Sequence, residues 1–436
     1  MQVDRSSTSQ SSTAQSSTAP SATAQSSTSK GSPEFGALQG VRVIDLTQML
    51  AGPYCTQLLA DQGADVVKIE PLGGEESRRA GPFHADDELK AFGGYFASVN
   101  RNKRSICLNI KTAEARQIIL DLVQDADVLV ENYRAGVMDR LGLSYETLRG
   151  RNPKLVYATI RGFGDPRGGE SPYVDWPAYD VVAQAMGGLM QINGPDPHTP
   201  MKVGPGVGDL FPAALCAYGI TAALFRAQRT GEGQFVDVAM VDSILALCER
   251  TIHQHSFQGV VPHPEGNRHP LLAPFGLFRA SDGHVALAAH FDPAWQKLCA
   301  LIGREDLKLD ARTVSMDARV ANRDFVYDEV ERFTRARTKA SLATVFGGSV
   351  PFGPVNDVRD VIRDPHFLKR EMVVKVPHPG LSHQVAIAGI PVKLTGTPGR
   401  IASRAPLAGE HTAEVLESLG LSKERIDALL DQRVVG

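Results

Sequence analysis

Short apolar runs alternate with amphipathic stretches of helical period along the first half of the chain. Each run is rich in β-branched residues, and turn residues such as Gly and Pro bound most of them, which is typical of buried strands. Predicted strands lie at 41–44, 66–69, 105–110, 128–130 and 155–160, and predicted helices at 54–62 and 113–124. Such strand–helix–strand units imply right-handed crossovers and a parallel sheet covered by helices. We therefore expect an open-sheet, Rossmann-like α/β domain with ligands beyond the carboxyl ends of its strands.

The pattern changes in the second half. A strand at 235–239 and a helix at 242–253 extend the large domain, which we assign to 37–258. Four prolines and no periodic core pattern predict a linker over 259–275. A hairpin around Asp282–Gly283 and two helical stretches predict a smaller α+β domain over 276–350. Residues 351–436 are expected to return to the large domain, with strands near 372–376 and 385–388 and a last helix near 410–419.

The first 36 residues have a different composition. Ser, Thr, Ala and Gln recur in near repeats without an apolar run, so this segment cannot bury a core and is expected to be disordered. Residues 31–35 (Gly-Ser-Pro-Glu-Phe) read as a cloning scar. We therefore attribute 1–36 to an expression vector and exclude it from the reasoning on the fold.

Charge and cysteine content narrow the class of protein. Forty-six Lys and Arg against 49 Asp and Glu give a net charge of -3, which favours neither nucleic acid nor a membrane surface as a partner. The five cysteines are scattered and odd in number, without metal-ligand spacing. Buried free thiols in a reducing, cytoplasmic compartment are expected. His253 and His255 point to different faces of their predicted helix, so no metal site is expected there.

The most distinctive stretch is 202–209, in which glycines at alternate positions lead to Asp209. Without side chains at Gly204, Gly206 and Gly208, a ligand can approach the backbone closely. An apolar helix is predicted from about Pro212 to Gln228, and its positive amino end favours an ionised Asp209 that can act as a nucleophile. The alternative is a plain helix cap, which is far commoner than a catalytic carboxylate. The G-x-G-x-G spacing differs from the G-x-G-x-x-G of dinucleotide-binding loops.

A second candidate is the cationic cluster at 100–104 (Asn-Arg-Asn-Lys-Arg), just before a predicted strand. It is either a solvated surface or a site for an anion such as phosphate. Lys111 and Arg140 stand at similar ends of elements. Together with Asp209, these cations outline a site with a positive mouth and one deep carboxylate, which suits an acyl group carried on a phosphorylated thiol.

From Leu38 to about Val435 the chain resembles the class III CoA-transferase family, which includes formyl-CoA transferase, carnitine CoA-transferases and α-methylacyl-CoA racemase. The resemblance covers nearly the whole chain, with its motifs in matching order. The matching runs are Gly40–Thr47, Leu50–Pro53, Gly63–Glu70, Asn100–Ser105, Val130–Tyr133, Val207–Asp209, Gly353–Val355 and Ala405–His411.

The resemblance implies roles for single residues. Asp209 matches the family's aspartate nucleophile, with Gly206 and Gly208 supporting the loop or donating to an oxyanion. Gln48 and Tyr179 are expected in the acid-binding pocket. Pro71 and Pro177 stand where some members carry basic residues. One or two of the contacts that those members make with the phosphates of CoA are therefore not expected here. The residues expected to bind CoA are Met49, Leu50, Ala51, Arg104, Leu108, Lys111, Asn132, Tyr133 and Arg140. Of these, Arg104 is chosen because it belongs to the cationic cluster.

The resemblance also implies a reaction. Asp209 would carry CoA between two acids through an anhydride and an aspartyl-CoA thioester, with the CoA thioester as substrate and no permanent cofactor or metal. The resemblance implies that racemases of the family need a His-Asp pair at the position of Tyr179 and Asp180. Tyrosine is a poor base at neutral pH, so transfer is favoured over racemisation. A racemase and a non-catalytic CoA-binding module remain as alternatives. We expect an interlocked homodimer, succinyl-CoA as donor and a small dicarboxylate as acceptor.

Overall fold

Six parallel strands form the sheet at the centre of the large domain in the computed structural model, which describes residues 34–436. The strand order is β3-β2-β1-β4-β5-β6, and every neighbouring pair is parallel. The strands are β1 (Arg42–Asp45), β2 (Asp65–Glu70), β3 (Lys103–Cys107), β4 (Val128–Glu131), β5 (Val156–Arg161) and β6 (Phe235–Ala239). The predicted α/β class is confirmed. The order reverses between β1 and β4, so the topological switch point lies between these two strands.

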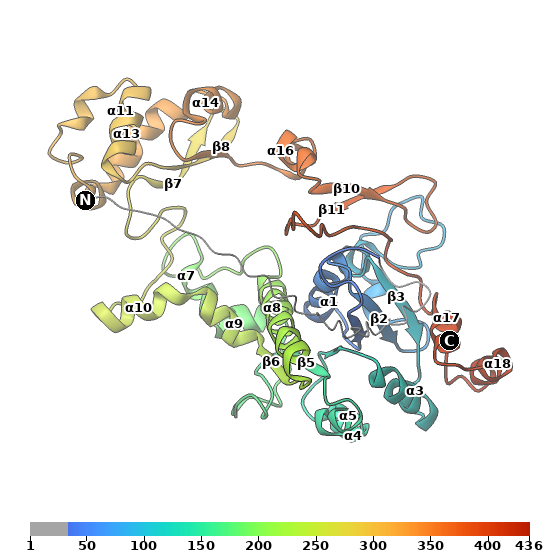
Figure 1. The fold of residues 1–436 in the computed structure, drawn as a ribbon. Helices are drawn as coiled ribbons and strands as arrows, with labels where there is room; N and C mark the ends of the chain where they lie inside the picture. The colour runs from blue at the N-terminus through green and yellow to red at the C-terminus, as the bar shows by residue number, and fades with distance from the viewer. Residues whose placement is uncertain (1–33) are drawn as a thin grey trace, which may run out of the picture.

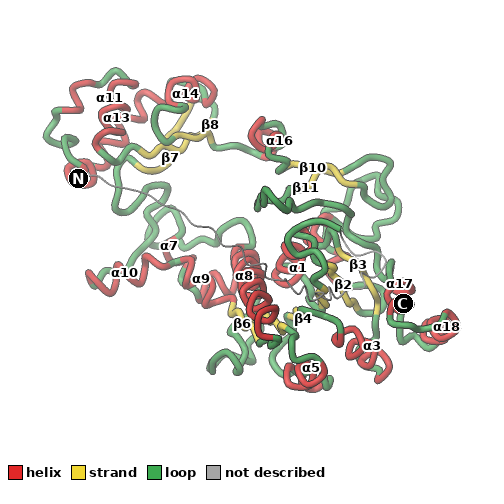
Figure 2. Tube along the Cα trace, in the orientation of Figure 1, coloured by secondary structure: helices red, strands yellow, loops and turns green. Residues whose placement is uncertain are grey.

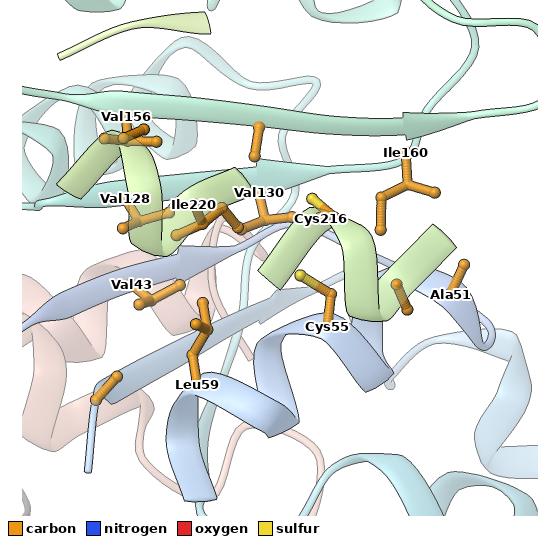
Figure 3. Packing of buried hydrophobic residues seen from close by; sticks show 14 of the residues in the cluster. Val43, Ala51, Cys55, Leu59, Val128, Val130, Val156, Ile160, Cys216 and Ile220 are labelled. Carbon is orange, nitrogen blue, oxygen red and sulfur yellow. The ribbon is translucent and has the colours of Figure 1, made fainter. Parts of the chain in front are cut away.

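Helices cover both faces of this sheet (Figure 1). One face carries α1 (Ala51–Asp61) and α8 (Val207–Thr230), and the other carries α3 (Ala113–Gln124), α17 (Thr412–Ser418) and α18 (Lys423–Asp431). Val43 packs with Cys55 of α1 and Cys216 of α8, as Figure 3 shows. The next residue, Ile44, packs with the opposite cluster. This division follows from the strand period of two residues, which sends successive side chains to opposite faces.

Helix α8 differs from its prediction in where it begins. It starts at Val207, five residues before Pro212, and therefore includes Gly208, Asp209 and a buried proline. It is the one helix within 34–436 that is long and apolar enough to cross a membrane by length and composition, with a mean hydropathy of 1.5. In the fold it acts as a core helix, because one stripe of it is buried against α1 and the sheet.

Short helices connect and flank these elements. A single helix was predicted at 242–253, but the structure divides it at Cys248, whose φ of -95° and ψ of 30° leave the helical range. Residues 162–178 contain no helix or strand. The connecting helices are η1 (Glu76–Arg79), α2 (Gly94–Val99), α4 (Val137–Arg140), α5 (Tyr145–Arg151), α6 (Asp180–Met186), α7 (Leu189–Ile192), α9 (Met240–Leu247) and α10 (Glu249–Gln258).

The smaller domain is an antiparallel sheet packed on helices. Its strand order is β7-β8-β9, and the buried Trp295 and Phe278 lie in its core. Strand β9 lies just beyond the predicted boundary at 350. The elements are β7 (Phe275–Ala280), β8 (Gly283–Ala288), α11 (Asp292–Leu301), η2 (Glu305–Lys308), α12 (Met316–Ala321), α13 (Arg323–Thr334), α14 (Lys339–Phe346) and β9 (Phe352–Pro354).

Two segments join the domains (Figure 2). The chain leaves the large domain after α10 and returns through α15 (Val358–Val361), α16 (Pro365–Lys369) and the hairpin of β10 (Val373–Val376) and β11 (Val385–Ala388). The end of the chain then lies beside β3, where the Asn109 N–H donates to the Val434 carbonyl at 2.8 Å. Helix α18 was not predicted, although Ser422 caps it. The predicted vector segment, except for 34–36, lies outside the described residues.

Candidate active site

The loop between β1 and α1 (46–50), called the switch-point loop below, lies at the topological switch point and is held by side chains. Asn132, which follows β4, accepts a hydrogen bond from the Gln48 N–H at 2.9 Å and donates one to the Gln48 carbonyl at 2.8 Å. Burial raises the pKa of the neighbouring Tyr133 to about 12, and the nearby Gln48 side chain opposes this shift. The fold therefore brings Gln48 together with Asn132, 84 residues further along the chain, and with the adjacent Tyr133.

Asp209 lies in the first turn of α8. Gly206 is the cap residue, and its carbonyl accepts from the Asp209 N–H at 3.1 Å, so Asp209 is not the plain cap that its local sequence favoured. Burial, helped by the negative charge of Asp180, raises the pKa of the Asp209 carboxyl to about 7. The expectation that the helix start holds this group ionised is therefore wrong. Loss of hydration outweighs the attraction of the helix amino end.

Asp180 anchors the glycine stretch that carries Asp209. The Gly208 N–H donates to Asp180 Oδ1 at 2.7 Å, and Gln184 Nε2 donates to both Asp180 oxygens at 2.9 Å. The Val203 N–H in turn donates to Gln184 Oε1 at 2.8 Å. The Gly208 N–H is thus engaged, which corrects the expectation that it serves an oxyanion. The N–H of Gly206 has no hydrogen-bond partner within 34–436, so the same role stays a prediction there.

The three glycines have different steric surroundings. A Cβ on Gly208 would lie 2.6 Å from the Asp180 carbonyl oxygen, so this glycine permits the close approach of α6 and α8 rather than that of a ligand. A Cβ on Gly206 would lie 3.1 Å from Leu50 Cδ2, which places the glycine stretch directly beside the switch-point loop. A Cβ on Gly204 would meet no atom within 4 Å.

Tyr95 on α2 faces the same site and was not among the predicted site residues. Burial raises the pKa of its phenol to about 12, with further contributions from the charges of Asp209, Glu75 and Asp180. The hydroxyl is therefore protonated at neutral pH and can donate a hydrogen bond close to Asp209. No motif marks a tyrosine in this loop-rich segment, and only the fold brings Tyr95 near enough to Asp209 for the charge of Asp209 to act on it.

The cationic cluster at 100–104 is occupied by carboxylates. Arg101 pairs with Asp61 at 2.7 Å, Lys103 with Asp45 at 3.0 Å, and Arg104 with both Asp65 and Glu414. Arg104 is the second residue of β3, so it lies toward the amino ends of the strands, away from the switch-point loop. The expected anion site and CoA contact of Arg104 are therefore corrected to structural ion pairs.

The other residues expected to bind CoA lie beyond the carboxyl ends of the strands or next to the loop. Lys111 and Arg140 are exposed after β3 and β4, and neither forms an ion pair with another described residue. Leu108 is buried at 1% exposure, so only its backbone could face a ligand. Ala51 begins α1 and is buried, whereas Tyr179 precedes α6 and is 64% exposed.

Within residues 34–436, no group of three or more His, Cys, Asp or Glu side chains is placed to hold a metal ion. The five cysteines are buried and free.

Comparisons with known proteins agree over most of the chain. The model of CoA-transferase family III matches residues 38–412. A succinyl-CoA:mesaconate CoA-transferase of Haloarcula marismortui is 50% identical over 88% of this chain and 97% of its own length. A succinate–glutarate CoA-transferase of Agrobacterium fabrum is 36% identical over 88% of this chain and 95% of its own. The crystal structure of a CaiB/BaiF family protein from Brucella suis has a TM-score of 0.78 and 35% identity, covering 88% of this chain and all of that one.

Proposed function

Because the chain belongs to CoA-transferase family III, as its motifs predicted, we propose that it moves CoA from succinyl-CoA to mesaconate or a similar small dicarboxylate. The observation that carries the proposal is the placement of Asp209, a half-buried carboxylate with a pKa near 7 beside the switch-point loop. The choice of substrates is supported by relatives whose names pair succinyl-CoA or succinate with another dicarboxylate.

The first half-reaction begins with attack of the Asp209 carboxylate on the thioester carbonyl of succinyl-CoA. The carbon–sulfur bond breaks, giving a mixed succinyl-aspartyl anhydride and the CoA thiolate. The thiolate then attacks the aspartyl carbonyl, succinate leaves, and CoA remains on Asp209 as a thioester. Covalent catalysis in this form divides one exchange into easier steps.

The second half-reaction runs in reverse with a new acid. A carboxylate of the acceptor attacks the aspartyl thioester, which forms a second anhydride and releases the CoA thiolate. The thiolate attacks the acceptor's acyl carbon, and the Asp209 carboxylate leaves as the free side chain. One thioester replaces another of similar energy, so the exchange needs no external energy source.

Tyr95 and the Gly206 N–H are the proposed donors to the oxyanions of these steps. Each attack places negative charge on a carbonyl oxygen near Asp209, and preorganised donors in a partly buried site stabilise such charge. Tyr95 fits because its raised pKa keeps the phenolic proton in place. The engaged Gly208 N–H instead fixes the loop from which Asp209 acts.

CoA is proposed to lie across the switch point. Met49, Leu50 and Ala51 would face its pantetheine arm, together with Asn132 and Tyr133. The exposed Lys111, which follows β3, and Arg140, which ends α4 after β4, would then meet the phosphates, since both lie beyond the carboxyl ends of strands. Gln48 and Tyr179 are proposed to border the dicarboxylate.

We further propose that the protein acts as a homodimer. Large apolar side chains remain exposed in the single chain, notably Tyr218 at 73%, Phe225 at 62% and Phe257 at 84%. Tyr218 and Phe225 lie seven residues apart on α8 and thus share one face of the helix. Exposed apolar faces of this kind are typical of interfaces. Sedimentation equilibrium of the purified protein would test this proposal, and a monomer at micromolar concentration would contradict it.

A panel of acceptor acids tests the function. Succinyl-CoA is incubated with mesaconate, glutarate, citramalate, oxalate or acetate, and the CoA esters are identified by liquid chromatography with mass spectrometry. We expect a new CoA ester with mesaconate above all, and none with the D209N variant. Hydrolysis without transfer to any acid would contradict the proposal. Deuterium uptake at the α-carbon of an acyl-CoA without an acceptor would indicate a racemase instead.

A further inference from the structure

Met49 has a backbone conformation that its residue type disfavours. Its φ of 68° lies in the left-handed region, where the Cβ of an L-residue crowds the neighbouring carbonyl oxygen. Glycine adopts this region freely and asparagine tolerates it, whereas methionine has no local compensation. Such a residue persists only where its surroundings hold it, and strained residues cluster at functional sites. Met49 lies in the middle of the switch-point loop.

The carboxylate of Glu75 holds Met49 in place. The Met49 N–H donates to Glu75 Oε2 at 2.8 Å, and the other oxygen of Glu75 lies 2.9 Å from Lys68 Nζ. Glu75 and Lys68 are both buried, at 2% and 0% exposure. Lys68 Nζ also donates to the Thr47 carbonyl at 2.7 Å, so the same ion pair binds the loop at two points. A charged acceptor makes a stronger hydrogen bond than a neutral one, which suits a strained donor.

The held loop contacts the nucleophile's own segment. Leu50 follows Met49, and its Cδ2 lies within 3.1 Å of the place where a Cβ of Gly206 would stand. Glu75 also lies close enough to Tyr95 for its charge to act on the phenol. Glu75, which lies just before η1, therefore contacts the loop proposed to bind CoA and lies near the donor proposed to face the oxyanion.

We propose that Glu75 is a positioning residue of CoA transfer, because its carboxylate, fixed by Lys68, keeps Met49 left-handed and so holds Leu50 against the glycine stretch of Asp209. The inference rests on the proposed function. Preorganisation of this kind favours the transition state, since a misplaced loop lowers the rate without removing any reacting group. The competing explanation is a buried ion pair that only stabilises the fold, as Asp61 and Arg101 do at the far end of α1.

A double-mutant cycle separates the two explanations. It compares wild type, Glu75→Gln, Met49→Asn and the double variant, because asparagine adopts the left-handed conformation more readily and needs the clamp less. Met49→Leu controls for loss of the methionine side chain without relief of strain. Asp61→Asn controls for loss of a buried ionised carboxylate elsewhere. The readouts are kcat and KM for succinyl-CoA, and the midpoint of urea unfolding.

We expect Glu75→Gln to lower kcat/KM at least tenfold in the wild-type background and no more than threefold in the Met49→Asn background. Met49→Leu should leave the effect of Glu75→Gln at tenfold. Asp61→Asn should lower the unfolding midpoint while changing kcat/KM less than twofold. Equal effects of Glu75→Gln in both backgrounds would overturn the proposal. So would equal losses of kcat/KM in Glu75→Gln and Asp61→Asn when the two variants have the same unfolding midpoint.

Two further outcomes remain distinguishable. If Glu75→Gln does not fold, Glu75→Asp replaces it, because the shorter side chain keeps the charge near Lys68 but draws back from the Met49 N–H. If no variant and not even the wild type transfers CoA, the proposed function fails. The unfolding cycle then still tests the clamp itself, since additive effects on the midpoint would show that positions 49 and 75 are uncoupled and would overturn it.

Discussion

The N–H of Gly208, the residue before the proposed nucleophile Asp209, donates a 2.7 Å hydrogen bond to Oδ1 of Asp180. This contact fixes the start of α8 to the start of α6. It also brings the Asp180 carboxylate near Asp209. The negative charge of Asp180 adds to the effect of burial, which raises the pKa of Asp209 to about 7. The carboxylate that anchors the start of α8 thus also affects the protonation of Asp209.

The first prediction concerns the pH dependence of Asp180→Asn. Only ionised Asp209 attacks a thioester, so kcat/KM of the wild type should rise with pH through about 7. The amide oxygen of asparagine can still accept the Gly208 N–H but carries no charge. The acidic limb of the pH profile should therefore move to lower pH. An unmoved limb would show that Asp180 does not act on the protonation of Asp209.

The second prediction concerns the stability of Asp209→Asn. Because burial raises the pKa of Asp209 from 3.8 to about 7, the folded state prefers the protonated form and loses stability as pH rises through that range. The shift corresponds to at most about 4 kcal/mol, and partial exposure reduces it. Urea unfolding should show the variant about 1–3 kcal/mol more stable than wild type near pH 8. The gain should vanish near pH 4, and a gain that is independent of pH would contradict this cause.

The third prediction compares two glycines of one stretch. Gly208→Ala places a Cβ 2.6 Å from the backbone oxygen of Asp180, so α6 and α8 must separate. Overpacking of this kind should reduce the free energy of unfolding by about 1–3 kcal/mol and lower the rate of transfer. Gly204→Ala meets no atom within 4 Å and should be nearly neutral in stability. Equal stability of the two variants would mean that Gly208 is not a packing glycine.

The fourth prediction concerns Tyr95→Phe, which removes the phenolic donor and keeps the ring. Loss of one donor to a developing oxyanion typically costs about 100-fold in kcat. We expect a loss of at least about tenfold in kcat, with a much smaller change in the KM for succinyl-CoA. The two parameters come from steady-state transfer kinetics. An unchanged kcat would remove Tyr95 from the mechanism.

The large-domain sheet could be predicted because its signals are local. The β-branched runs gave all six strands within one to three residues at each end, and 113–124 matched α3 at both ends. The division of the predicted helix at 242–253 could not be foreseen, since the apolar pattern runs on through Cys248. Helix α18 carries a Ser422 cap that the sequence does show, and it was overlooked.

The site could be predicted only where a motif marked it. Asp209 and Asn132 stand in such motifs, Gln48 lies between two of them, and the structure brings Gln48 and Asn132 into contact. Arg104 was misjudged because its partners Asp65 and Glu414 are distant in sequence, so its neutralisation is visible only in the fold. The pKa of Asp209 was misjudged in direction for a similar reason, because burial depends on elements that pack around α8.

One experiment bears on the central claim before any acceptor is known. The protein is mixed with succinyl-CoA and quenched with hydroxylamine, and the peptide that contains Asp209 is examined by mass spectrometry. We expect this side chain to be converted to the hydroxamate in wild type and left unmodified in D209N, as a trapped aspartyl thioester or anhydride requires. A wild-type peptide that stays unmodified while CoA transfer proceeds would contradict Asp209 as the carrier of the acyl and CoA groups.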